Sequence, residues 1–156
     1  MAARDEMQDG IAATPPESLV RMTHVAYGLY ALSMLVPVTA LVAIVIDYVY
    51  RDEAKGTWLQ SHYRWQIRTF WFSLAWSALL VAALVAAVFS VFFGAAAPIA
   101  AGAGAVQVTN ALIAAAFAAP VAFVLLAVAF LALSLWISYR IVRGWYVLGK
   151  RQPMPV

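Results

Sequence analysis

Few side chains in this sequence could carry acid–base or metal chemistry. The 156 residues include seven acids, two histidines and no cysteine, which excludes disulfides, thiolate metal sites and cysteine nucleophiles. Haem ligation would require His24 and His62 to meet at one cofactor, and the topology derived below separates them by a bilayer. We therefore expect no catalytic residue, no metal and no cofactor. Both histidines are assigned to hydrogen bonds at the membrane surface.

Asp47 stands at the boundary of a long apolar run, and two interpretations of it are open. As a buried acid it would need a partner, and Arg68 or Arg140 is expected on the same side of the membrane. That ion pair would join the first span to the second or the third. As an exposed acid, Asp47 would lie among lipid headgroups. A proton relay is not expected, because no second acid follows Asp47 into the bilayer.

Two segments rich in arginine and tryptophan form a candidate contact surface for lipid or a partner. Its members share a position beside predicted spans: Arg64, Arg68, Arg140, Arg143, Trp65 and Trp145. One interpretation is a specific site for an anionic phospholipid or a partner protein. The other is that the arginines set the topology and extend their charged ends toward water. The sequence favours the second interpretation, and the site remains a hypothesis.

The composition indicates an integral membrane protein. Of the residues, 65% are hydrophobic and 11% are charged, whereas a soluble domain carries about 25% charged residues. The net charge of +3 accompanies basic residues beside apolar runs, which favours anionic headgroups over nucleic acid as the partner. The heavy use of alanine is typical of the bacterial inner membrane.

The uncharged runs predict an all-α protein with three transmembrane helices. The first covers about 24–46, long enough for a hydrocarbon core of about 30 Å, with Pro37 as a tolerated kink. The second and third cover about 70–93 and 111–139. Residues 1–14 are expected to form a disordered tail, residues 15–150 a single membrane domain, and residues 151–156 a second tail.

An amphipathic segment precedes the second span. Between residues 57 and 69, Leu59, Tyr63 and Ile67 recur on one helical face, with Arg64 and Arg68 on another. Such a helix is expected to lie in the interface before the chain turns into the bilayer. Alanines four residues apart in the second and third spans would allow close helix packing. A homo-oligomer is the alternative use of these alanines.

The basic residues predict the sidedness of a three-span protein. Residues 1–23 and the 94–110 loop would share one side with two Lys/Arg, and residues 51–68 and the carboxyl-terminal tail would share the other with eight. Because basic residues concentrate in cytoplasmic loops, the sequence predicts a multi-pass inner-membrane protein. Its amino terminus would be periplasmic and its carboxyl terminus cytoplasmic.

Four short segments carry a family resemblance. They are Thr23-His24, Tyr50-Arg51-Asp52-Glu53, Ser61-His62-Tyr63-Arg64-Trp65-Gln66-Ile67-Arg68-Thr69-Phe70, and Tyr139-Arg140-Ile141-Val142-Arg143-Gly144-Trp145. Together they resemble small uncharacterised proteobacterial inner-membrane proteins over about residues 23–155. That group is distantly similar to the chloroplast inner-envelope import component (Tic-type) family. The resemblance implies a helical fold, and through the chloroplast members an association with protein import.

Two functions are consistent with this pattern. The first is a non-enzymatic accessory or scaffolding protein of the bacterial inner membrane, whose basic and aromatic cytoplasmic face contacts a partner protein or anionic lipid. The alternative is an oligomeric subunit of a transport or protein-translocation channel. An enzyme is not expected, because the sequence shows no convergent set of acids, histidines or cysteines.

Overall fold

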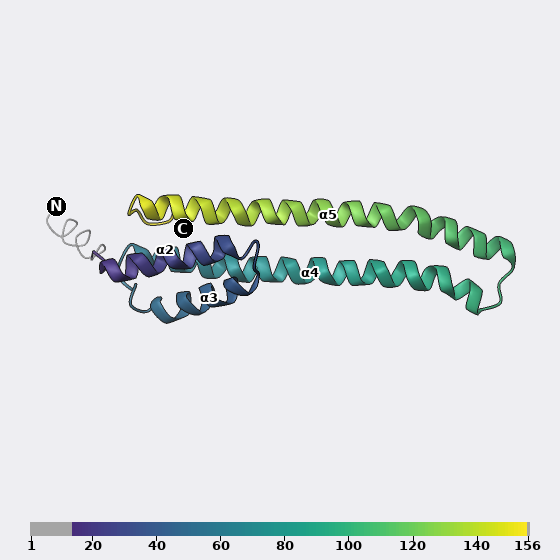
Figure 1. Ribbon diagram of the computed structural model, residues 1–156, viewed down its shortest axis with the longest axis horizontal. Coiled ribbons are helices and arrows are strands. Elements are labelled where there is room, and N and C mark those ends of the chain that lie inside the picture. The colour runs from purple at the N-terminus through teal and green to yellow at the C-terminus, as the bar shows by residue number, and fades with distance from the viewer. Residues whose placement is uncertain (1–13, 156) are drawn as a thin grey trace, which may run out of the picture. The chain divides into compact units, whose positions relative to one another are not determined.

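The computed structural model describes residues 14–155 and is helical, with 82% helix and no strand in that range. Four helices follow one another: α2 (Glu17–Leu32), α3 (Val38–Tyr50), α4 (Leu59–Ala100) and α5 (Ala105–Gly149) (Figure 1). The all-α prediction is therefore confirmed. Apart from Thr14, the predicted disordered tail lies outside the described residues.

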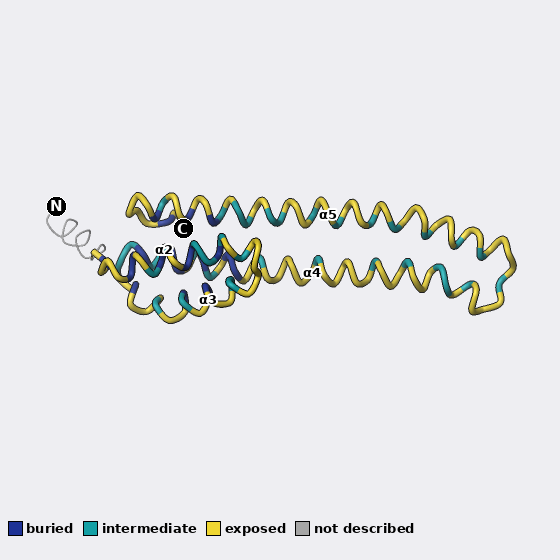
Figure 2. The backbone as a smooth tube through the Cα atoms, in the orientation of Figure 1, coloured by how far each residue is buried: buried dark blue, intermediate teal, exposed yellow. Residues whose placement is uncertain are grey.

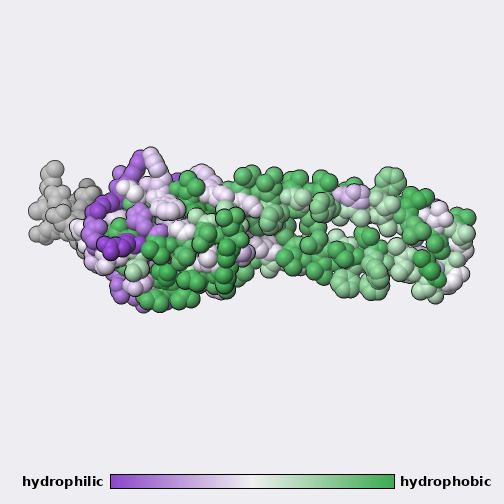
Figure 3. Space-filling view, in the orientation of Figure 1, coloured by the Kyte–Doolittle hydropathy of each residue, from purple (hydrophilic) through white to green (hydrophobic). Residues whose placement is uncertain are grey.

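The chain divides into two compact units, and α4 and α5 contribute to both. We call residues 14–73 and 136–155 the polar unit, and residues 74–135 the apolar hairpin. Buried positions gather in the polar unit, on α2, α3 and the adjoining parts of α4 and α5 (Figure 2). Every charged residue of the sequence lies outside residues 74–135. The hydrophilic atoms of the described chain accordingly gather over the polar unit (Figure 3).

The predicted first span does not form, and three spans are not supported. Helix α2 ends at Leu32 and α3 begins at Val38, because Pro37 has no N–H and its ring opposes helical continuation through the preceding turn. Side chains then close the break. Ser33 Oγ donates to the Tyr30 carbonyl at 2.7 Å, and Thr39 Oγ1 donates to the Leu29 carbonyl at 2.9 Å. Helices α2 and α3 therefore pack against each other as a hairpin.

The predicted interfacial helix and second span form one helix instead of two. Residues 59–93 contain no glycine or proline, so no residue in this range breaks the helix between Leu59 and Phe93. Helix α4 also continues to Ala100, through Pro98. The turn expected near residue 69 is thus absent from the structure.

The predicted connection at 94–110 shortens to residues 101–104. Alanine is a strong helix former. The alanine-rich residues before 101 therefore extend α4, and those after 104 extend α5. The chain reverses where Gly102 adopts a φ of +66°, a conformation that glycine tolerates. Helix α5 includes the predicted third span and runs on to Gly149 without a break at Pro120.

Helices α4 and α5 are long and apolar enough to span a membrane. Each contains an 18-residue window with a mean hydropathy of 2.6, and none of either window is buried within the protein. An apolar helix in the core of a soluble protein would be largely buried, whereas these expose large side chains such as Leu79, Phe89 and Phe123. Such a surface requires an apolar partner.

The two ends of the described chain meet in the polar unit. Arg151 Nη2 lies 2.8 Å from Glu17 Oε1, and Trp145 Nε1 donates to His24 Nδ1 at 3.0 Å. These contacts join the start of α2 to the end of α5. The structure therefore does not support the predicted placement of these segments on opposite sides of a membrane, nor the bilayer expected between His24 and His62.

Candidate functional site

The polar unit has a core that includes polar side chains. Its buried polar residues come from three helices: Thr23, Asp47, His62, Gln66 and Thr69. Burial of such groups is unfavourable unless they find hydrogen-bond partners. Thr23, Asp47 and His62 bond to tyrosines of this unit, and Thr69 bonds to Trp65 and Arg140. The side-chain amide of Gln66 has no hydrogen-bond partner among residues 14–155.

Asp47 is buried and pairs with a tyrosine. Tyr30 Oη donates to Asp47 Oδ2 at 2.8 Å, while Asp47 Oδ1 has no hydrogen-bond partner among residues 14–155. Burial raises the pKa of Asp47 to about 8, and the hydrogen bond from Tyr30 opposes part of that rise. Of the two arginines considered as partners, Arg140 donates to Thr69 and Arg68 is exposed. Asp47 is therefore a buried acid, as the first interpretation has it, but its partner is Tyr30 of α2 and not an arginine of α4 or α5. The interpretation as an exposed headgroup acid does not agree with this burial.

His62 is held at both ring nitrogens. Its Nε2 lies 2.9 Å from the Gln152 carbonyl, and its Nδ1 lies 3.1 Å from Tyr27 Oη. Because a carbonyl can only accept, Nε2 carries the proton and Nδ1 accepts from Tyr27. Burial lowers the pKa of His62, which favours this neutral tautomer. His62 thereby links α2, α4 and the carboxyl-terminal segment.

The Tyr27 ring occupies the space beside Gly144 of α5. A Cβ added at Gly144 would lie 2.6 Å from Tyr27 Cε1, much closer than side chains approach one another. Glycine is therefore required by the close approach of α2 and α5. Sequence analysis missed Tyr27 and Tyr30, although Thr23, Tyr27 and Tyr30 recur at helical spacing on one face of α2. Their polar ends could have indicated a buried hydrogen-bonding face.

Arg140 and Trp65 form an internal pair between α5 and α4. The Arg140 guanidinium carbon lies 3.7 Å from the Trp65 ring centroid. Arg140 Nε donates to Thr69 Oγ1 at 2.8 Å, and Trp65 Nε1 donates to the Arg140 carbonyl at 3.2 Å. These contacts fix the guanidinium against the helix pair, so Arg140 and Trp65 stabilise the unit.

The other members of the predicted contact surface separate into different places. Arg143 is exposed and donates to Tyr139 at 3.0 Å, and its guanidinium carbon lies 5.9 Å from the Trp65 ring centroid. Trp145 bonds to His24. Arg64 and Arg68 are exposed on α4, where they meet two cations that sequence analysis did not assign to the surface. The structure thus brings together parts of the predicted set, and not all six residues.

A basic groove lies between α4 and the turn that precedes it. It has a volume of about 410 Å³ and is lined by eight residues: Arg51, Asp52, Lys55, Gln60, Tyr63, Arg64, Ile67 and Arg68. Asp52 accepts from Lys55 Nζ at 2.9 Å. The four cations exceed this one acid by three charges, so the groove is suited to an anionic ligand.

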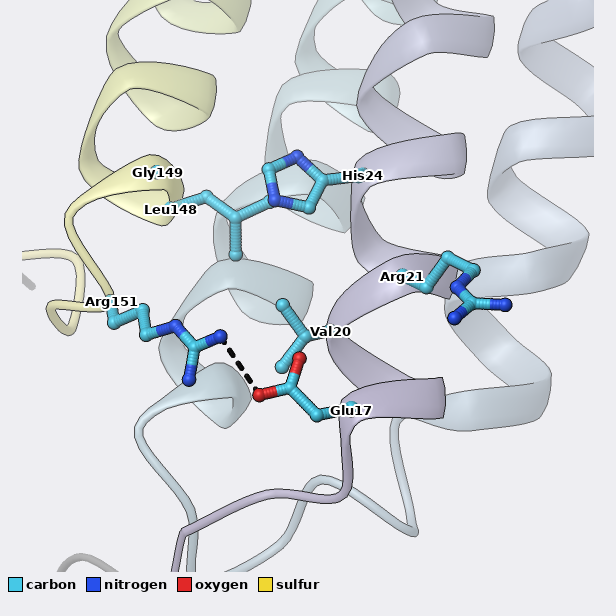
Figure 4. Close-up of a pocket in the computed structure, with 7 residues that line it drawn as sticks. All are labelled: Glu17, Val20, Arg21, His24, Leu148, Gly149 and Arg151. Atoms are coloured by element: carbon cyan, nitrogen blue, oxygen red, sulfur yellow. Dashed lines mark ion pairs between the residues drawn. The ribbon is translucent and has the colours of Figure 1, made fainter.

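A second pocket, of about 340 Å³, lies where α2 meets the end of α5. It is lined by Glu17, Val20, Arg21, His24, Leu148, Gly149 and Arg151. Figure 4 shows Glu17 and Arg151 pointing toward each other, while Arg21 points away from them (Figure 4). The acid therefore pairs with one of the two arginines here, which leaves this pocket less basic than the groove.

Comparisons with protein-family models, with curated proteins and with solved structures found no match to this chain. The resemblance described above therefore stays a prediction. Function has to be argued from the two units themselves.

Proposed function

We propose that this chain is a non-enzymatic accessory or scaffolding protein of the bacterial inner membrane, with α4 and α5 crossing the bilayer. The observation that carries the proposal is the segregation of charge. Two unburied apolar helices pass through residues 74–135, which contain no charged residue, and all ten Lys/Arg lie in the remaining sequence. The bacterial assignment itself is supported by the family resemblance and the alanine-rich composition.

With two crossings, the positive-inside rule supports a cytoplasmic polar unit. The loop at 101–104 carries no Lys/Arg, so all ten basic residues fall on the opposite side. This distribution is more one-sided than the two-to-eight division of the three-span prediction. Both ends of the described chain are then cytoplasmic, in agreement with the Glu17–Arg151 ion pair.

The α2–α3 hairpin enters the cytoplasmic leaflet without crossing the membrane. Its helices, of 16 and 13 residues, are about 24 Å and 20 Å long, shorter than the hydrocarbon core of about 30 Å. The tip exposes Leu35 at 82% and Val38 at 60%. The outward face of α3 is also apolar. Charged residues stand at the base, at Arg21 and at 51–55.

The scaffolding surface is the outward face of α5 within the polar unit. It combines four exposed residues at helical spacing: Tyr139, Val142, Arg143 and Tyr146. Tyrosine and arginine are enriched where proteins contact one another. Among the groups with shifted pKa values, Asp47 and His62 are buried and bonded within the core, and neither lines the groove or the second pocket. Two others do line the groove, and both are held by partners within the polar unit: Lys55 lowers the pKa of Asp52, and burial raises that of Tyr63, which bonds to Thr23. This arrangement favours contact over catalysis.

Photocrosslinking in cells tests the proposal. A photoreactive amino acid at position 142 should give a discrete adduct with a partner protein, whereas one at Glu53, an exposed residue in the 51–58 turn, should not. The protein should also remain in the membrane pellet after high-salt and carbonate washes. Release by carbonate would contradict the two crossings. Equal or absent adducts at the two positions would contradict the scaffolding surface.

A further inference from the structure

We infer that the basic groove, with the aromatic residues beside it, binds a glycerophospholipid that has an anionic headgroup. The inference rests on the proposed function only in requiring that the polar unit lie at a membrane. It adds a ligand class and a binding site. The basic residues of the groove would then bind a ligand in addition to setting the topology.

Both walls of the site change character in the same direction. Arg51, which directly follows α3, lies over the ring of Tyr48, 4.9 Å from its centroid, and exposed Val45 lies one turn further along α3. On α4, Arg68 is followed one turn later by exposed Trp71 and Phe72. A cation is therefore followed by an aromatic ring on each wall, and on α3 an apolar side chain comes next.

A hydrogen bond aligns the two walls. Trp71 Nε1 donates to Tyr48 Oη at 3.0 Å, which brings the aromatic level of α4 against that of α3. Arg51 and Arg68 both line the groove, on the same side of this aromatic level. The site is thus ordered from a cationic end, through two amphipathic rings, to an apolar end.

An anionic phospholipid has the complementary order. Its phosphate fits among Arg51, Lys55, Arg64 and Arg68, which have guanidinium and ammonium donors for phosphate oxygens. Its glycerol region falls at Tyr48 and Trp71, since tyrosine and tryptophan favour the headgroup boundary. Its acyl chains continue along the apolar face of α3. An acidic peptide would match the cations but not the apolar end of the site.

The test measures lipid retained by the intact protein. Protein purified in mild detergent and mixed with phosphatidylglycerol or phosphatidylcholine is examined by native mass spectrometry. Wild type should retain phosphatidylglycerol and little phosphatidylcholine. The double variant Arg64→Gln/Arg68→Gln should retain roughly 25-fold less phosphatidylglycerol, at about fivefold for each cation removed.

Two further variants make the comparison specific. Arg21→Gln/Lys150→Gln removes the same charge from exposed residues of the polar unit outside the groove, and should change retention less than twofold. Arg64→Lys/Arg68→Lys keeps the charge and should retain lipid. Lipid retention by this lysine variant, together with matching helical circular-dichroism spectra for the three double variants, would show that the glutamine substitutions do not act by unfolding the protein.

A phosphatidylglycerol with a photoreactive acyl chain tests the direction of binding. Its adducts should fall on the apolar face of α3 around Val45, where the acyl chains are placed. Equal losses in the groove and control variants, or adducts elsewhere, would overturn the site while leaving membrane residence intact. Loss of a co-purifying acidic protein with unchanged lipid would assign the groove to that protein. Release of the protein from the membrane by the carbonate wash would instead overturn the proposed function.

Discussion

At the scale of single residues, the polar unit depends on one close approach and a set of buried hydrogen bonds. Tyr27 contributes to both, because its ring lies against Gly144 and its hydroxyl donates to His62. Asp47 and Tyr30 form a second link within the α2–α3 hairpin. Changes at these positions should therefore affect the stability of the unit before they affect any surface.

Replacement of Gly144 by alanine should destabilise the polar unit. The added methyl group would overlap the Tyr27 ring, and overpacking of this kind lowers the free energy of unfolding by about 1–3 kcal/mol. Thermal melting in detergent measures the loss. Gly149→Ala is the matched control, since nothing lies within 4 Å of a Cβ at that position. Equal melting of the two variants would contradict the Tyr27–Gly144 packing.

Asp47→Asn should flatten the pH dependence of stability. The folded pKa of Asp47, about 8, lies above its ordinary value of 3.8, so the folded state binds more protons than the unfolded state between these limits. Wild-type stability therefore falls as pH rises from about 4 to about 8. Stability is measured against pH for both proteins, and the variant's values are subtracted from those of wild type. The difference isolates the contribution of Asp47 from that of His62, which has the opposite sign. Parallel wild-type and variant curves would show that the pKa of Asp47 is the same in the folded and unfolded states.

At the scale of elements, helical content could be predicted but the number of spans could not. Hydropathy describes residues 24–46 as one uncharged run and cannot distinguish a crossing helix from two short helices folded together. The difference depends on Pro37, on the side-chain bonds from Ser33 and Thr39, and on Tyr30 reaching Asp47. The Tyr30–Asp47 hydrogen bond joins residues 17 positions apart, and no local sequence pattern predicts it.

The candidate site, like the fold, could be predicted only in part from the sequence. Sequence analysis found Arg64 and Arg68 through the amphipathic period of residues 57–69. It did not add Arg51 and Lys55, because their approach depends on the turn between α3 and α4. It also grouped Arg140 with the surface arginines, whereas Arg140 is half-buried against Trp65 and Thr69.

A lysine on the outward face of α3 should reveal whether that face meets lipid. Val42 is exposed on α3, and Val42→Lys should lower stability in lipid nanodiscs by about 2 kcal/mol or more, because a charge near hydrocarbon is costly. A water-exposed substitution would change stability by less than about 0.5 kcal/mol. Glu53→Lys, in the turn at the hairpin base, is the control. Unchanged melting of Val42→Lys would place α3 in water.

At the scale of the whole molecule, the separation of charge is what organises the chain. The apolar hairpin contains no charged residue, and two of its serines, Ser90 and Ser134, donate back to carbonyls of their own helices at 2.7 Å and 2.8 Å. This hairpin is therefore suited to lipid contact. The polar unit collects the charges, the buried hydrogen bonds and both polar pockets.

Because the sequence has no cysteine, single introduced cysteines can report the side on which each segment lies. Ser18→Cys, Lys55→Cys and Gln152→Cys, all at exposed positions, should react with a membrane-impermeant maleimide only in inside-out vesicles. Ala103→Cys, in the α4–α5 connection, should react only in intact spheroplasts. Leu35→Cys, at the hairpin tip, should be protected in both.

Labelling of Ser18→Cys from the same side as Ala103→Cys would restore three crossings, because an odd number is needed to separate residue 18 from residue 152. Labelling of Leu35→Cys from the outer side would show that the hairpin passes through the bilayer, and labelling from the inner side would show that it lies in water. Joint protection of Leu35 with inner labelling of residues 18 and 55 is expected only when α2 and α3 enter and leave by the same leaflet.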